Sequence, residues 1–110
     1  MTEQEAEQSS EHAVFIRFGR WSGDLNEIYE IEELLTSVVA EADVGEVDGH
    51  EVAVDGSDGT FYLYGPDADA LLNAVMPHLQ QLELMRGATV ILRYGPPVDG
   101  VREEGWRLAD

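Results

Sequence analysis

The sequence contains no cysteine and no lysine, and each absence narrows what the chain can be. Without cysteine there is no disulfide, no thiolate ligand for a metal and no cysteine nucleophile. The N-terminus has neither the basic start nor the apolar run of a signal peptide, and no apolar stretch approaches the length of a membrane span. The composition therefore predicts a cytoplasmic domain without disulfides.

Positive charge is scarce along the whole chain. Six basic residues stand against 23 Asp and Glu, which gives a formal net charge of -17. Nucleic acids and anionic membranes bind proteins largely through cationic side chains, so the charge argues against both partners. It favours a basic protein or a cation, although a high-salt or lysine-poor source organism would produce the same composition. The basic residues are all arginines: Arg17, Arg20, Arg86, Arg93, Arg102 and Arg107.

The length of 110 residues, 44% of them hydrophobic, suits a single domain with one core. Residues 1–12 are polar and acidic and are predicted to form a disordered tail. The domain is expected to occupy residues 13–110. Its C-terminal stretch, 96–110, is expected to add an edge strand at about 101–108.

Alternating apolar residues predict strands, and apolar residues three or four apart predict helices. Asp24 followed by Glu27 is typical of a capping box, which predicts a helix over about 24–42. A second helix is expected over about 65–87, and Pro77 within it predicts a kink or break just before the proline. Strands are expected at 13–18, around 51–54 ahead of a turn at 55–59, at 60–64 and at 88–94.

The order strand, helix, strand, strand, helix, strand is that of the split βαβ, or ferredoxin-like, plan. We therefore predict an α+β fold whose antiparallel sheet has the spatial order 4-1-3-2 and whose two helices cover one face. Each strand has one clearly apolar face for the helices, which supports the arrangement. In the second strand, Val52 and Val54 are expected to point toward the helices.

The sheet face turned away from the helices is the main candidate site. It is expected to carry three aromatic residues, an isoleucine and two arginines: Phe15, Arg17, Tyr62, Tyr64, Ile91 and Arg93. Such a patch is typical of a surface that a partner buries. The placement resembles the RNA-recognition motif, in which aromatics on the first and third strands stack bases. However, Asp58 stands where that motif has a basic residue, and the net charge argues against RNA.

Two interpretations of this face stay open. The first is protein contact, most simply a homodimer packed face to face, which makes the chain a non-enzymatic interaction module. The second is a small anionic or aromatic ligand held by Arg17 and Arg93. Two other classes remain: an acidic inhibitor or immunity-type protein that neutralises a basic partner, and, by fold analogy alone, a small dimeric enzyme. No catalytic residue is predicted.

No cofactor and no metal site is predicted. The stretch "EVDGHEVAVDGSDG" is rich in oxygen ligands but does not match a calcium loop. Counting from Asp55, the sixth residue is Thr60 and the twelfth is Pro66, where the loop requires Gly and Glu. Hairpin turns explain the stretch more simply. The three histidines lack the spacing of metal ligands: His12, His50 and His78.

The tripeptide Tyr-Gly-Pro occurs twice, at 64–66 and 94–96, each time where a strand is expected to end. After the first copy, Asp67 is expected to cap the second helix. The stretch "DGTFYLYGPDADALLNAVMPHLQQLELMRGATVILRYGPP" is similar to a group of small acidic bacterial proteins with a "YGPDAD…LRYGPP" signature. The resemblance extends over about residues 15–97. It implies a single domain and carries over neither an activity nor a site residue.

Overall fold

A computed structural model of the protein describes residues 11–109, so the predicted tail, 1–12, lies outside the described residues except for its last two positions. Five strands, two α-helices and a short 3-10 helix make up this part of the chain. In chain order the elements are β1 (His12–Phe18), α2 (Leu25–Ala42), β2 (Glu46–Val52), β3 (Gly59–Gly65), α3 (Ala68–Leu79), η1 (Glu83–Met85), β4 (Thr89–Arg93) and β5 (Glu103–Arg107).

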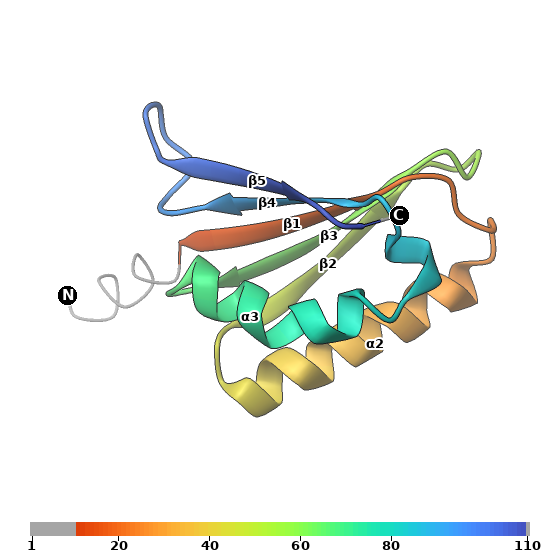
Figure 1. Cartoon of the computed structure of the whole chain (residues 1–110), viewed down its shortest axis with the longest axis horizontal. Helices are drawn as coiled ribbons and strands as arrows, with labels where there is room; N and C mark the ends of the chain where they lie inside the picture. Colours follow the sequence, from red (N-terminus) through yellow and green to blue (C-terminus); the bar gives the residue numbers. More distant parts are fainter. Residues whose placement is uncertain (1–10, 110) are drawn as a thin grey trace.

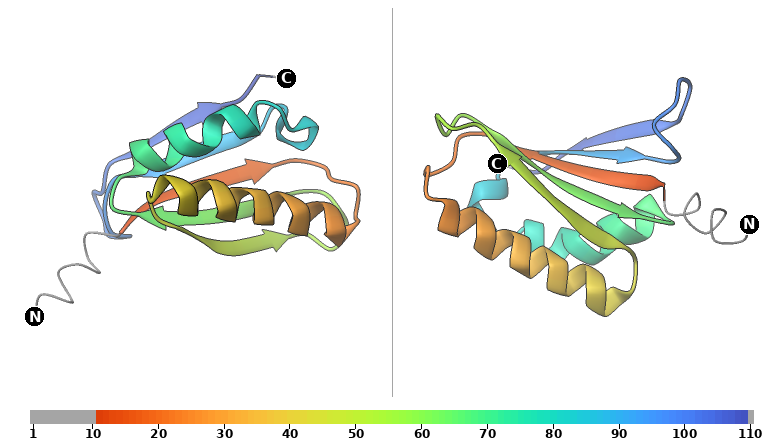
Figure 2. Two further views of the ribbon diagram at one scale, coloured as in Figure 1. Left: turned by 90° about the horizontal axis from the view of Figure 1, so that it is seen from below. Right: turned by 180° about the vertical axis from the view of Figure 1, so that it is seen from behind.

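The strands form one antiparallel sheet in the order β2-β3-β1-β4-β5, and both helices lie on the same side of it (Figures 1 and 2). The predicted α+β class is confirmed. The strand order differs from the predicted 4-1-3-2 because a fifth strand, β5, lies outside β4 and extends the sheet. Among residues 11–109, no helix covers the opposite face of the sheet (Figure 2).

The first strand shows how the sequence produces two different faces. Successive side chains of a strand point to opposite sides of the sheet. Val14, Ile16 and Phe18 point toward the helices and are buried. Between them, Phe15 is half-buried and Arg17 is exposed on the other side.

Helix α2 begins where the sequence predicts a cap. The carboxylate of Asp24 accepts a hydrogen bond from the Asn26 N–H at 2.9 Å, which stabilises a helix end by about 1 kcal/mol. The second half of the predicted capping box is replaced. The Glu27 carboxylate accepts from the Ser22 hydroxyl at 2.9 Å, and the Ser22 oxygen accepts from the Asp24 N–H at 3.1 Å.

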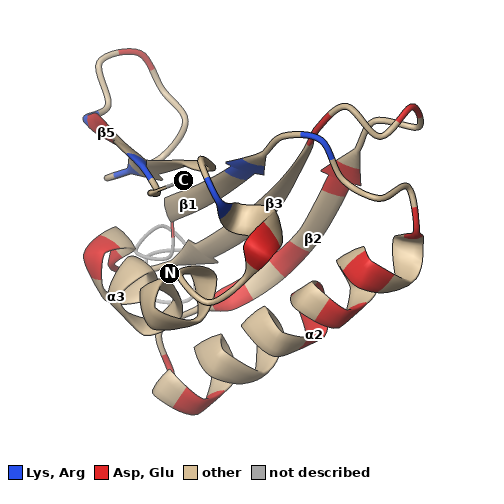
Figure 3. Cartoon of the chain, turned by 45° about the vertical axis from the view of Figure 1, so that its right-hand side comes forward, with Lys and Arg blue, Asp and Glu red and all other residues tan. Residues whose placement is uncertain are grey.

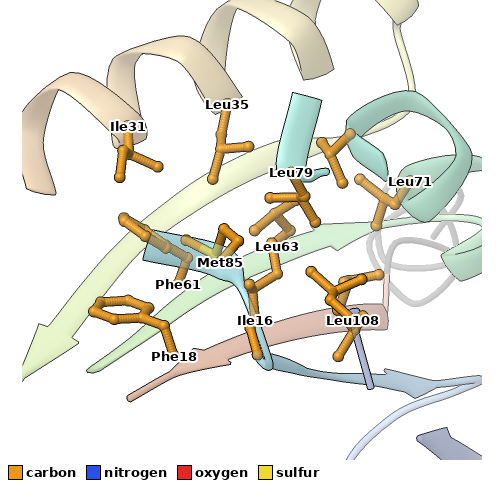
Figure 4. Packing of buried hydrophobic residues seen from close by; sticks show 14 of the residues in the cluster. Ile16, Phe18, Ile31, Leu35, Phe61, Leu63, Leu71, Leu79, Met85 and Leu108 are labelled. Carbon is orange, nitrogen blue, oxygen red and sulfur yellow. The ribbon is translucent and has the colours of Figure 1, made fainter. Parts of the chain in front are cut away.

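A single hydrophobic core lies between the sheet and the two helices (Figure 4). Burying a large apolar side chain contributes roughly 1.5–3 kcal/mol, so this layer supplies most of the driving force for folding. The largest fully buried side chains come from both helices, η1 and the three middle strands: Phe61, Ile16, Ile28, Leu35, Leu63, Leu71, Leu79, Met85, Leu92, Val14, Val39 and Val75. The two edge strands, β2 and β5, therefore lie at the margins of the core.

The second strand ends earlier than predicted. The prediction that Val54 points toward the helices is wrong, because β2 ends at Val52 and Val54 is fully exposed in the turn that follows. The turn closes early: the Gly56 N–H donates to the Ala53 carbonyl, and the Ala53 N–H donates to the Asp58 carbonyl, both at 3.0 Å. These bonds draw the chain out of the strand two residues before the predicted turn.

Helix α3 contains Pro77 without the predicted break before it. The helix continues through the proline and ends at Leu79. A proline removes one hydrogen bond to the residue four positions earlier, and here that loss falls in the last turn, where the helix is ending. The chain then forms η1, whose Met85 is buried in the core, and Gly87, with a φ of 73°, leads into β4.

Acidic residues recur along α2 and β2 (Figure 3). The exposed ones there are Glu30, Glu33, Glu41, Glu46, Asp48 and Glu51. Neither helix within residues 11–109 is both long and apolar enough to cross a bilayer.

Candidate interaction surface

The face of the sheet away from the helices, called here the outer face, carries three rows of side chains that run across the strands. Residues paired in adjacent strands point to the same side, so the register defines each row. The central row is Gly49, Tyr62, Phe15, Ile91 and Gly105. The flanking rows are Glu46, Tyr64, Ala13, Arg93 and Glu103, and Glu51, Thr60, Arg17, Thr89 and Arg107. The register thus places all six predicted residues on this face.

Phe15 is at the centre of the outer face. Its ring meets the Tyr62 ring edge to face, with centroids 5.6 Å apart, and meets the Tyr64 ring in the same way at 6.2 Å. The guanidinium carbon of Arg93 lies 5.7 Å from the Phe15 centroid. Aromatic pairs of this kind contribute about 0.5–1.5 kcal/mol beyond burial. Because these side chains shield one another, Phe15, both tyrosines and Ile91 are half-buried.

Arg93 is the one charged residue among residues 11–109 that is buried, with 8% of its surface exposed. Its Nε donates to the Gly95 carbonyl at 2.7 Å, and its Nη2 donates to the Glu11 carbonyl at 2.8 Å. Both acceptors are backbone groups. Arg93 therefore ties the segment before β1 to the turn after β4, which is a structural task.

Arg17 lies at the opposite end of the outer face and is exposed. Arg93 pairs with Ala13, four residues before Arg17 on β1. A strand rises about 3.4 Å per residue, so the two arginines are roughly 13 Å apart along the strands. Because Arg93 already donates to two backbone carbonyls, the two arginines do not form one shared site in this structure.

The β2 side of the outer face is acidic. The Tyr62 hydroxyl donates to the Glu51 carboxylate on the neighbouring strand. That hydrogen bond raises the pKa of Tyr62, because the neutral phenol is the donor and the adjacent charge disfavours a phenolate. Tyr62 therefore keeps its ring against Phe15 and its hydroxyl at an acidic rim.

A polar cluster that sequence reasoning missed lies on the helix side of the sheet, where β1 and α3 begin and β4 ends. The Tyr94 hydroxyl donates to the Asp69 carboxylate at 2.7 Å and lies 3.4 Å from a Glu104 carboxylate oxygen. The Arg102 guanidinium is 4.5 Å from the Tyr94 centroid and pairs with Glu104. The His12 ring meets Tyr94 edge to face at 5.9 Å.

The segment after the first Tyr-Gly-Pro meets the second copy in this polar cluster. Asp69 follows the first copy and Tyr94 begins the second, so the repeat was the available signal. The hydrogen bond to Asp69 raises the pKa of Tyr94 to about 12. Asp67 caps α3 as predicted, accepting from the Asp69 N–H at 3.0 Å. His12, predicted to belong to the tail, is instead the first residue of β1, and its Nδ1 accepts from the Ala68 N–H at 3.1 Å.

Within residues 11–109, no three His, Cys, Asp or Glu side chains gather as a group that could hold a metal ion. His50 pairs with Glu32 at 2.9 Å, across the contact between β2 and α2. His78 lines an open groove of about 440 Å³ between the helices. Hydrogen bonds from Ser57 lower the pKa of Asp55, as expected for a turn.

Comparisons with protein-family models, with curated proteins and with solved structures find no match to this chain.

Proposed function

We propose that the chain is a non-enzymatic protein-interaction module, built on a ferredoxin-like frame with one added strand, and that it binds through the outer face. A second copy packed face to face is the simplest partner. The observation that carries the proposal is the central row, in which Tyr62, Phe15 and Ile91 form an apolar strip across the middle strands. No helix of the described residues covers this strip. Apolar patches of this kind mark interaction sites.

The surroundings of the strip also support a protein partner. Glu46 and Glu51 border it on the β2 side, and Arg17 and the two threonines of its row border it at one end. An apolar centre within a polar, charged rim is the usual composition of a protein interface. The net charge of -17 opposes the approach of two copies at low salt, so face-to-face association should strengthen as salt is added.

Phe15→Glu tests the proposed face, because it places a carboxylate at the centre of the contact. Sedimentation equilibrium over about 5–500 µM should show the average mass of the parent rising with concentration, and the variant should lose the part of that rise that the outer face contributes. Val54→Glu is the matched control, since it makes the same kind of change at a fully exposed residue outside the face. A parent that stays monomeric over this range contradicts self-association through the face.

A second variant guards against a folding defect at Phe15. Arg17 is exposed, so Arg17→Glu should leave the circular dichroism spectrum and the urea midpoint nearly unchanged. It adds negative charge to the rim of the face and should weaken association several-fold. If it associates as tightly as the parent at low salt, the contact does not include this rim.

The exposed carboxylates of α2 and β2 favour a second candidate, a basic partner protein (Figure 3). Like charges gathered on one side attract a basic surface and lose that attraction as salt screens them. Retention on immobilised polyarginine should then fall more for Glu30→Gln combined with Glu33→Gln than for Glu83→Gln combined with Asp99→Asn. Equal retention by the two double variants argues against a localised acidic site.

A further inference from the structure

The strand β5 forms an open edge of the sheet. It pairs with β4 on one side and is the last strand in the order β2-β3-β1-β4-β5 (Figure 1). Four of its five residues are exposed, and Glu104 is half-buried. No segment among residues 11–109 pairs with the other side of β5. An open strand edge is a template for another strand, and proteins that do not use such an edge normally obstruct it.

The hydrogen bonds to β4 show which backbone groups of β5 point toward the open edge. The Tyr94 N–H donates to the Arg102 carbonyl at 2.9 Å, and the Leu108 N–H donates to the Ala88 carbonyl at 2.8 Å. In an antiparallel ladder the N–H and C=O of one residue point to the same side, and the side alternates along the strand. Even-numbered residues therefore face β4. The N–H and C=O groups of Glu103, Gly105 and Arg107 point outward.

We propose that a second copy of the chain pairs with this edge, β5 against β5 and antiparallel, about a twofold axis at Gly105. This register places Gly105 opposite Gly105 of the second copy, and Glu103 opposite Arg107 of the second copy. All three outward-facing residues then meet outward-facing residues, so each forms a closely hydrogen-bonded pair. A register shifted by one residue would set outward-facing groups against groups already bonded to β4.

The side chains complement one another in the same register. Glu103 and Arg107 stand in the two flanking rows of the outer face, and the Arg107 Nε also donates to the Gly87 carbonyl of its own chain at 3.4 Å. The twofold axis places each next to the opposite charge on the second copy, so two attractive pairs form, one at each end of the strand. Directly opposed opposite charges stabilise a strand pair, and like charges destabilise it. Arg102 to Arg107 holds two acidic and two basic residues, so this segment is locally neutral in a chain of net charge -17.

Trp106 gains a partner in the paired arrangement. It lies on the helix side of β5 and is 54% exposed. With Met76, Leu82 and Leu108 it lines a groove of about 530 Å³ beside the end of α3. In the proposed register the two Trp106 side chains are diagonal neighbours on the same side of the joined sheet, within reach of each other. The pairing thus covers an exposed aromatic residue that the isolated chain leaves in water.

The edge contact is separate from the face-to-face contact proposed above and does not rest on it. A twofold axis between antiparallel strands is perpendicular to the sheet, so it keeps the two outer faces on the same side. Five paired residues a side place this contact among small interfaces, below about 1,200 Å², and we expect a dissociation constant of about 10–200 µM.

Charge exchange across the edge is the decisive experiment. Glu103→Arg sets like charges opposite each other at both ends of the contact, and so does Arg107→Glu. Each single variant should therefore associate about tenfold more weakly than the parent in sedimentation velocity runs at about 200 µM and 0.15 M salt. An equimolar mixture of the two variants restores opposite charges in both pairs of the mixed dimer, and association should return to at least the parent level.

Rescue by mixing distinguishes loss of the edge contact from a folding defect and from loss of the outer-face contact. Neither variant can regain a lost fold by being mixed, and Phe15→Glu should leave the edge contact intact. Amide hydrogen exchange locates the contact. The protection of residues 103–107 should increase with the concentration of the parent, and it should not increase with the concentration of Glu103→Arg. Single variants that associate like the parent, a mixture that stays as weak as its components, or concentration-independent exchange in β5 would each overturn the proposal.

Discussion

β2 and β5 both border the sheet, but β2 carries more features that obstruct a further strand. Its register with β3 shifts between Val47 and Gly49, so Asp48 has no partner and the strand bulges. Its exposed carboxylates, Glu46, Asp48 and Glu51, repel a second acidic chain. Bulges and charges of one sign are common means of blocking an edge.

β5 has no bulge along its described length, and its exposed carboxylate, Glu103, is accompanied by Arg107 on the same strand. All five residues pair with β4 in an unbroken register, and the strand carries both signs of charge. Its glycine faces open space, since a Cβ at Gly105 would meet nothing within 4 Å. The β2 edge is bulged and acidic, whereas the β5 edge is regular, carries both signs of charge and has an exposed tryptophan. This difference favours pairing of a further strand with β5.

The two edges also differ in how firmly the core holds them. Beneath β2, the His50 ring lies between the rings of Tyr29 and Phe61, at 5.6 and 6.1 Å, and its Nδ1 pairs with Glu32. β5 is held by its pairing with β4 and by Leu108, which follows β5 and is buried in the core. Substitutions where β2 begins should therefore lower the free energy of unfolding more than substitutions within β5.

Gly45→Ala should show the largest effect. Gly45 precedes β2 with a φ of 149°, and a Cβ there would lie 2.1 Å from the Tyr64 carbonyl oxygen. Strain and the clash with fixed backbone together should lower the free energy of unfolding by roughly 3 kcal/mol in urea titrations. Gly105→Ala is the matched change on β5 and should stay within about 0.5 kcal/mol of the parent. Similar losses at both glycines would remove the contrast between the edges.

Leu108→Ala should have the next largest effect. Leu108 is 9% exposed and belongs to the core cluster, so truncating it should cost about 2–3 kcal/mol. The loss should be local as well, with faster amide exchange in β5 than in β2. Trp106→Ala, at a residue that is 54% exposed, should cost less than about 1 kcal/mol in dilute solution. If the two substitutions cost the same, Leu108 is not what attaches β5 to the core.

The same contrast separates what the sequence could predict from what it could not. Central strands such as β1 alternate cleanly between buried and outward residues, so their faces, and the six residues predicted for the outer face, follow from pattern alone. The bounds of β2 could not be predicted in this way, because the bulge at Asp48 and the early turn at Ala53 shift its alternation of buried and outward residues. The bounds of β5 were hard to predict, because "EEGWR" has one apolar side chain and so shows no alternation. The Tyr94–Asp69 bond joins segments 25 residues apart, which no local pattern encodes.

Tyr94→Phe should have a smaller effect than Gly45→Ala or Leu108→Ala, and it tests the polar cluster beside β5. The Tyr94 hydroxyl donates to Asp69 on α3 and lies beside Glu104 on β5. Removing it deletes one hydrogen bond to a charged acceptor while keeping the ring, so the free energy of unfolding should fall by about 1–2 kcal/mol near pH 7. The comparison is a urea titration of both proteins at the same ionic strength.

The pH dependence of that difference identifies the bond. The neutral phenol is the donor, and its pKa in the folded chain is about 12, above the usual value of 10. A pKa raised on folding means that the contribution is complete below about pH 10 and is lost as the pH rises toward 12. The parent should therefore lose more stability than Tyr94→Phe over this interval, and the two curves should converge. Tyr62, whose pKa is also raised, is present in both proteins and cancels. Parallel curves up to pH 12 would mean that the hydrogen bond from Tyr94 to Asp69 does not contribute to stability.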